Sequence, residues 1–236
     1  YAELKPAFRP NVETRDIKFV DFQIKASAAD RSQVVKEMND FQKQLASAAD
    51  PAAVVSKSGS EIPYLGLPVS SKAYQQYPDI ASKIDSLSVG TTGVVENAQD
   101  NTLNIIRVLS KAQLADSIQF RQINIAAATP DEARAKADSI QKALAGGADF
   151  DALAKRYGQT GEKVWFTGQQ YEMAPSMNQD NRTFINALLN GEVNATQKLA
   201  LTQGNIILQV LDKKAFTTKT TAAVIKKVVD FSKATR

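Results

Sequence analysis

Near its middle the chain reads Ile118-Gln119-Phe120-Arg121-Gln122-Ile123-Asn124-Ile125, and 101 residues earlier it reads Ile17-Lys18-Phe19-Val20-Asp21-Phe22-Gln23-Ile24. Both stretches alternate apolar with polar residues, which is the pattern of a strand that buries one face. The same offset relates Glu61–Leu65 to Glu162–Phe166, and Ser86–Gly90 to Ala187–Gly191. One such match arises easily by chance, but an offset that recurs at three places predicts an internal duplication.

Each predicted copy has the same order of elements. In the second copy Thr129-Pro130-Asp131-Glu132 predicts a helix start, Gly146-Gly147 predict its end, and a shorter helix is expected over Asp149–Tyr157. The matching helices of the first copy are expected at 29–46 and 51–56. Each copy closes with a third helix, a glycine turn and two strands. This order predicts an α+β fold with two tandem domains, each a small antiparallel sheet surrounded by helices.

The duplication also sets the predicted domain boundaries. Residues 1–14 are expected to form a linker and residues 216–236 an exit segment. Between them lie a first domain at 15–112 and a second at 113–215. Residues 220–236 fit either a helix or a strand, because a β-branched run and a helical apolar face coincide there.

The chain contains no histidine and no cysteine. Histidine is the usual proton shuttle near neutral pH and the commonest metal ligand, so Ser-His-Asp, Cys-His and zinc-hydrolase mechanisms each lose an essential group. Acidic pairs such as Asp149 and Asp151 lie at predicted helix starts, where carboxylates cap the helix. No nucleotide-binding or calcium-loop motif occurs. We therefore expect no cofactor and no metal.

Charge and hydropathy exclude two further classes of partner. The net charge of +4 is spread along the chain rather than clustered, so nucleic-acid binding is not expected. No apolar run approaches the roughly 20 residues needed to cross a bilayer. Any membrane contact is therefore expected to come from segments outside residues 1–236.

Four phrases of the second copy resemble the parvulin family of peptidyl-prolyl cis-trans isomerases. They are Gly146-Gly147-Ala148-Asp149-Phe150-Asp151-Ala152-Leu153-Ala154, Trp165-Phe166, Leu188-Leu189-Asn190-Gly191-Glu192-Val193 and Gly204-Asn205-Ile206-Ile207-Leu208-Gln209-Val210-Leu211-Asp212. The resemblance spans residues 117–214 and, more faintly, 15–110. It implies two parvulin-like (FKBP-like) domains. Tandem units of this kind resemble the surA/ppiD type of bacterial periplasmic folding factor.

That resemblance implies partners and a location. The expected partners are unfolded or nascent exported polypeptides and proline-containing segments. The expected location is the periplasmic side of the bacterial cell envelope.

The catalytic positions of the family do not keep their identities. Its two histidines fall on Gln122 and Ile206 in the second copy, and on Asp21 and Asn104 in the first. Its Cys or Asp after the second helix is matched at best by Gln159 or Thr160. We therefore expect polypeptide binding with little or no turnover.

The resemblance implies a peptide-binding groove lined by apolar and aromatic side chains. In the second copy the candidates are Gln122, Trp165, Phe166, Met173, Met177, Phe184 and Ile206. The first copy offers Asp21, Tyr64, Leu65, Tyr74, Tyr77 and Asn104, and a carboxylate at Asp21 predicts the weaker site. In a simpler interpretation the aromatic residues only fill the core.

Two other functions remain open. One is an active isomerase, because an apolar pocket that removes water from the prolyl amide lowers the rotational barrier of about 18–20 kcal/mol without proton transfer. The other is a structural spacer within a larger chaperone.

Overall fold

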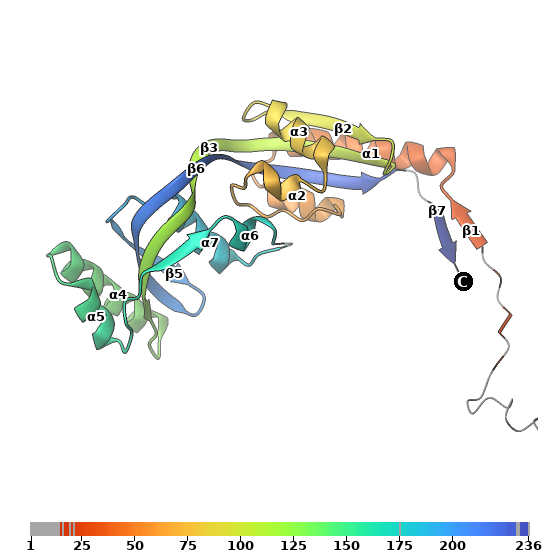
Figure 1. Ribbon diagram of the computed structural model, residues 1–236. Helices are drawn as coiled ribbons and strands as arrows, with labels where there is room; N and C mark the ends of the chain where they lie inside the picture. The colour runs from red at the N-terminus through yellow and green to blue at the C-terminus, as the bar shows by residue number, and fades with distance from the viewer. Residues whose placement is uncertain are drawn as a thin grey trace, which may run out of the picture.

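Two long strands join two lobes into an elongated molecule (Figure 1). The structure is a computed structural model that describes residues 15, 17, 18, 20, 22–174, 176–229 and 232–235. Strands β3 (Thr102–Ile125) and β6 (Gly204–Val228) pair antiparallel along their length, with register shifts at Val108/Ser110 and Gln119/Phe120. They contain 24 and 25 residues, whereas strands usually contain about 5–6. Each strand therefore belongs to the sheets of both lobes.

Lobe two is built on residues 117–125 of β3 and 204–214 of β6. Its other elements are α4 (Pro130–Ala145), α5 (Phe150–Arg156), β4 (Val164–Thr167), α6 (Gln169–Glu172), α7 (Gln179–Asn190) and β5 (Thr196–Leu201). The strand order is β4-β3-β6-β5. Helices α4 and α5 bury Ile123, Ile125 and Ile207 on one face, and α7 packs on the other face against Phe120 and Leu208.

Lobe one is built on residues 102–115 of β3 and 216–228 of β6. Its other elements are α1 (Ala28–Ser47), α2 (Pro51–Ser58), the 3-10 helix η2 (Ser71–Tyr74), α3 (Pro78–Ser86) and β2 (Thr92–Asn97). Helices α1 and α2 cover Ile105 and Ile225 on one face of the sheet. Helix α3 covers Ile106 and Val224 on the other. Two helices on one face and a third on the opposite face is thus the plan of both lobes.

The end of the chain returns to lobe one. The prediction that 216–236 form an exit segment is wrong for residues 216–228, because these continue β6 and pair with β3. The predicted boundary between 112 and 113 likewise falls inside β3. Residues 220–236 fit either a helix or a strand by sequence; residues 220–228 form a strand, and the burial of 222–225 shows that it is covered on both faces.

The first strand expected at 17–24 does not lie beside β3 among the described residues. Residues 22–25 form β1 (Phe22–Lys25), which pairs with β7 (Ser232–Thr235), and the neighbour of Ile105 in the sheet is Ile225. Residues 1–14, the predicted linker, and Asp21 lie outside the described residues.

Local helix signals are confirmed. The side chain of Thr129 accepts a hydrogen bond from the backbone N–H of Glu132 at the start of α4. The side chain of Asp149 accepts one from the backbone N–H of Ala152 at the start of α5. Helix α2 ends at Gly59, whose φ of 65° requires the left-handed conformation that glycine adopts without strain. Within the described ranges, no helix is long and apolar enough to cross a membrane.

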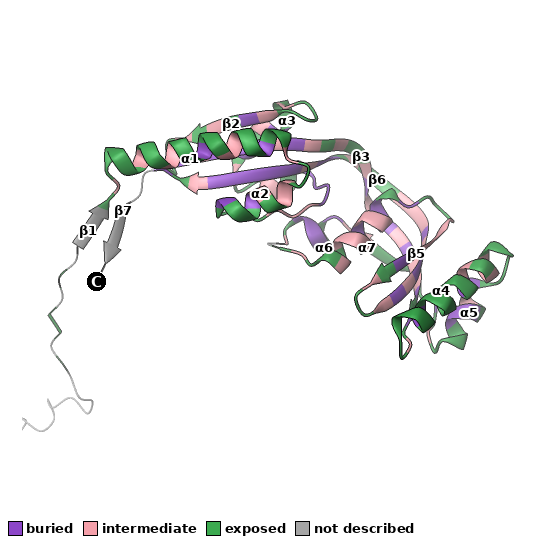
Figure 2. Cartoon of the chain, turned by 180° about the vertical axis from the view of Figure 1, so that it is seen from behind, coloured by how far each residue is buried: buried purple, intermediate pink, exposed green. Residues whose placement is uncertain are grey.

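The two lobes also touch through the chain between α2 and η2. Leu67 and Val69 of this segment are buried in the core cluster of lobe two. The hydroxyl of Tyr171 donates a hydrogen bond of 2.7 Å to the carbonyl of Pro68. Along β3 and β6 the buried residues lie within each lobe, and residues 109–114 and 211–218 between them are exposed or half-buried (Figure 2). The lobes are therefore held by side-chain packing as well as by the strands.

Candidate functional site

Four of the predicted peptide-binding residues lie around one core cluster in lobe two. Phe166, Met177, Phe184 and Ile206 are partly buried and pack against its buried members. The ring of Phe184 meets Phe120 edge-on at 5.5 Å between centroids. Phe166 stacks on Tyr171 at 5.7 Å. Each ring thus has a packing role, and its remaining exposed area is what a ligand would contact.

Gln122 occupies the same face of β3 as Phe120, because residues two apart on a strand point the same way. Its Nε2 donates to Oδ1 of Asn124 at 3.3 Å. Its Oε1 is buried and has no hydrogen-bond partner. A buried acceptor without a partner costs about 1–3 kcal/mol, so the Gln122 amide is left with an unmet hydrogen bond on this face.

Gln159 holds the backbone of the same strand. Its Nε2 donates to the carbonyl of Asn124 at 2.7 Å, and its Oε1 accepts from the N–H of Asn124 at 2.8 Å. Gln159, one of the two candidates for the family's Cys or Asp position, is thus occupied in fixing the strand.

Trp165 and Met173 lie apart from this face. Adjacent strand residues point to opposite faces, so Trp165 cannot share the face of Phe166. Trp165 is 38% exposed, and the Lys214 ammonium lies 4.8 Å from the centroid of its ring. Met173 lines a pocket at the lobe junction. The seven predicted residues therefore do not form one surface, because Trp165 and Met173 lie apart from the others.

A cavity of about 390 Å³ lies at the end of lobe two, where β5 and β6 meet the start of α7. Ile206 lines it, together with Asn124, Asn178, Asp180 and Leu201. The carboxylate of Asp180 accepts hydrogen bonds from the backbone and hydroxyl of Thr202, which fixes the wall. This hollow offers amide groups and apolar surface to a polypeptide.

In lobe one the position that resembles the last-strand histidine is a core residue. Asn104 is 1% exposed and donates to the carbonyl of Val95 and the hydroxyl of Thr102, both at 3.3 Å. Asn104 is therefore structural.

A buried ionic cluster at the lobe junction was not predicted. The Lys219 ammonium is fully buried and forms ion pairs with Asp116, at 2.5 Å, and with Glu172. Ser70 donates to Glu172 through both its backbone N–H, at 3.2 Å, and its hydroxyl, at 2.5 Å. Burial, with help from the charges of Glu172 and Asp116, raises the pKa of the nearby Tyr171 phenol. Lys219 lies between threonines at 217–218 and 220–221, so no apolar run in the sequence signals its burial.

Among the described residues, no group of three or more acidic side chains is arranged to hold a metal ion.

Comparison with known families decides what lobe two is. Residues 103–214 match the model of the PPIC-type PPIASE domain. The chain contains a parvulin domain of the PpiC type. No curated protein and no solved structure matches the chain.

The match has a structural meaning. It begins at Leu103, near the start of β3, and ends at Lys214, in β6 where the strand passes from lobe two to lobe one. The parvulin domain thus contains all of lobe two. Residues 28–102 and 216–228, which complete lobe one, lie outside the match.

Proposed function

We propose that the parvulin domain binds unfolded or proline-containing segments of exported polypeptides with little or no catalytic turnover. The family activity is prolyl cis-trans isomerisation. A chain without histidine has no imidazole to shape the polar side of such a site. The expected location is the periplasmic side of a bacterial cell envelope.

The observation that carries this proposal is the pair Gln122 and Ile206, which resemble the family's histidine positions. The two lie on neighbouring strands, and the partner of Ile206 in the sheet is Asn124. Neither side chain transfers a proton near neutral pH. Around them Phe184, Met177 and Phe166 supply adaptable apolar area, which suits a binder of varied sequences.

We also propose that lobe one is a second, degenerate parvulin-like unit, as in surA/ppiD-type tandem folding factors. Two features support this. One is the sequence repeat at 101 residues. The other is the shared plan, in which α1 and α2 match α4 and α5, and α3 matches α7.

Peptide binding tests the proposal. A labelled peptide with one proline is expected to bind the protein, and Phe184→Ala is expected to lower the affinity about 5-fold or more, because loss of a contact aromatic costs roughly 1–3 kcal/mol. Fluorescence anisotropy measures the affinity. Tyr157→Ala is the matched control, because Tyr157 is an exposed aromatic at the end of α5.

Equal affinity of wild type and Phe184→Ala, with both proteins folded by circular dichroism, would contradict binding at this face. If no peptide binds either protein, a structural spacer becomes the better description.

A further inference from the structure

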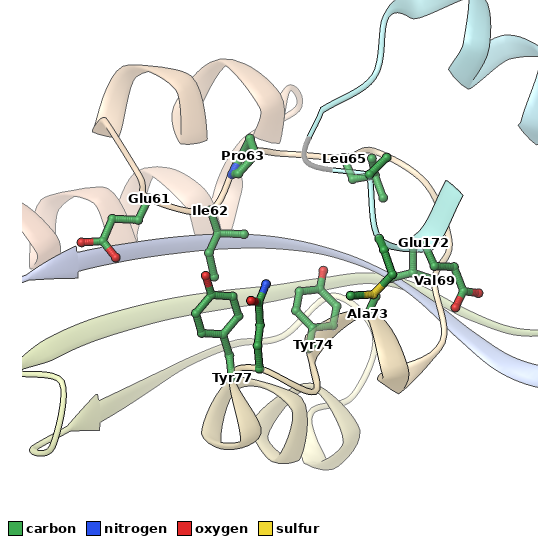
Figure 3. Close-up of a pocket in the computed structure, with 12 residues that line it drawn as sticks. Glu61, Ile62, Pro63, Leu65, Val69, Ala73, Tyr74, Tyr77 and Glu172 are labelled. Carbon is green, nitrogen blue, oxygen red and sulfur yellow. The ribbon is translucent and has the colours of Figure 1, made fainter. Parts of the chain in front are cut away.

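A second cavity lies where the lobes meet, outside the face described above. Its volume is about 250 Å³, smaller than the roughly 300–1,000 Å³ of pockets for drug-sized ligands. It suits one or two residues of a polypeptide. Ile62, Pro63, Leu65, Tyr74 and Tyr77 of lobe one line it, and Glu172 and Met173 close it from lobe two (Figure 3). Neither lobe forms this pocket alone.

The two carboxylates of the pocket are already paired. Glu172 binds Lys219 and Ser70, and Glu61 accepts from Lys226 at 2.5 Å. A cationic ligand would therefore have to compete with cations that the fold already supplies. Charge does not select the ligand.

The polar side chains left over are the hydroxyls of Tyr74 and Tyr77 and the amide of Gln76. Over the part of the chain that the structure describes, neither the Tyr74 nor the Tyr77 hydroxyl has a hydrogen-bond partner. Both point toward the segment 62–65 across the pocket (Figure 3). Burial, together with the neighbouring Tyr64, raises the pKa of Tyr74 to about 12. The phenol is therefore protonated at neutral pH and can donate.

Aromatic walls with free donors match the chemistry of proline. Proline-rich segments dock on aromatic-lined grooves in an extended conformation that costs little further entropy. Proline presents carbonyl acceptors but has no backbone N–H. A buried N–H without a partner is costly, and both carboxylates of this pocket are already paired, so a proline residue fits better than another apolar residue.

We propose that this junction pocket binds a proline residue of an extended polypeptide, with the Tyr74 hydroxyl donating to the carbonyl that precedes the proline. The proposal rests on the proposed function only in taking an unfolded polypeptide as ligand. A polypeptide that occupies both this pocket and the face around Phe184 would be held at two places, which strengthens binding without a new contact at either.

The test uses the full chain with Phe184→Ala as background, so that the parvulin face is weakened. A peptide Ala-Ala-Pro-Pro-Ala-Ala, blocked at both ends, is titrated while the backbone amides of Ala73 and Gln76 are followed by NMR. We expect these amides to shift, and an all-alanine peptide to leave them unchanged. Tyr74→Phe keeps the ring and removes only the hydroxyl, and is expected to weaken binding about 3- to 10-fold. Tyr157→Phe, the same change on an exposed ring, is expected to have no effect.

Three outcomes overturn the proposal. The first is equal affinity of Tyr74→Phe and Tyr157→Phe, and the second is equal affinity for the proline and all-alanine peptides. Loss of all peptide shifts in the Phe184→Ala background also overturns it, while leaving the proposed function intact. Conversely, wild-type affinity in that background, sensitive to Tyr74→Phe, supports the junction pocket and contradicts binding at Phe184.

Discussion

Deletion of residues 216–236 is expected to unfold lobe one while α4, α5 and α7 of the parvulin domain stay folded. The deletion removes part of β6, a strand buried on both faces, together with Val229 just after it. Val224, Ile225 and Val229 are each at most 3% exposed. Burying a Val or Ile side chain contributes about 1.5–3 kcal/mol, so these three contribute roughly 5–9 kcal/mol, comparable with the 5–15 kcal/mol of a whole domain. Backbone hydrogen exchange resolves the two lobes.

A deletion that begins after Val229 is the control, since it removes β7 but leaves β6 whole. Lobe one should stay protected in that shorter deletion. If residues 28–110 remain protected after the deletion of 216–236, β6 is dispensable and the assignment of its end to lobe one is wrong.

Replacing Lys219 by methionine is expected to destabilise the protein by about 3–5 kcal/mol, the usual loss when one partner of a buried ion pair is removed. Without the ammonium, the carboxylates of Glu172 and Asp116 face each other at the lobe junction with no cation between them. Urea unfolding near neutral pH measures the effect.

The double variant Lys219→Met with Glu172→Gln should recover part of the loss, because it removes the more buried of the two uncompensated charges. A loss below about 1 kcal/mol in Lys219→Met alone would show that the cluster does not hold the lobes.

The helices were predictable because their signals are local. A cap residue such as Thr129 or Asp149 and a terminal glycine such as Gly59 act within one turn, so the sequence around each is sufficient. Strand pairing is not local. The partner of Ile105 is Ile225, and nothing in the apolar run around Ile225 distinguishes a buried strand from a helix face. Hence the domain boundaries at 112/113 and 215/216 missed the two strands that both lobes share.

The candidate site was predicted in part for the same reason. Phe166, Phe184 and Ile206 come together because each follows the periodicity of its own strand or helix, and Met177 lies directly before the N-cap of α7. Trp165 was grouped with Phe166 from a two-residue phrase, although alternation along a strand separates them. The junction pocket depends on how two lobes meet, which no local pattern contains.

Cis-trans exchange of a proline peptide, in the presence of a small molar fraction of the protein, tests binding without turnover most directly. Uncatalysed exchange takes tens to hundreds of seconds, so magnetisation-exchange NMR shows cross-peaks between the cis and trans forms only if a catalyst is present. The account predicts peptide-induced shifts of the protein near Phe184 and no exchange cross-peaks. Strong cross-peaks that disappear with Phe184→Ala would contradict it and identify the parvulin domain as an active isomerase.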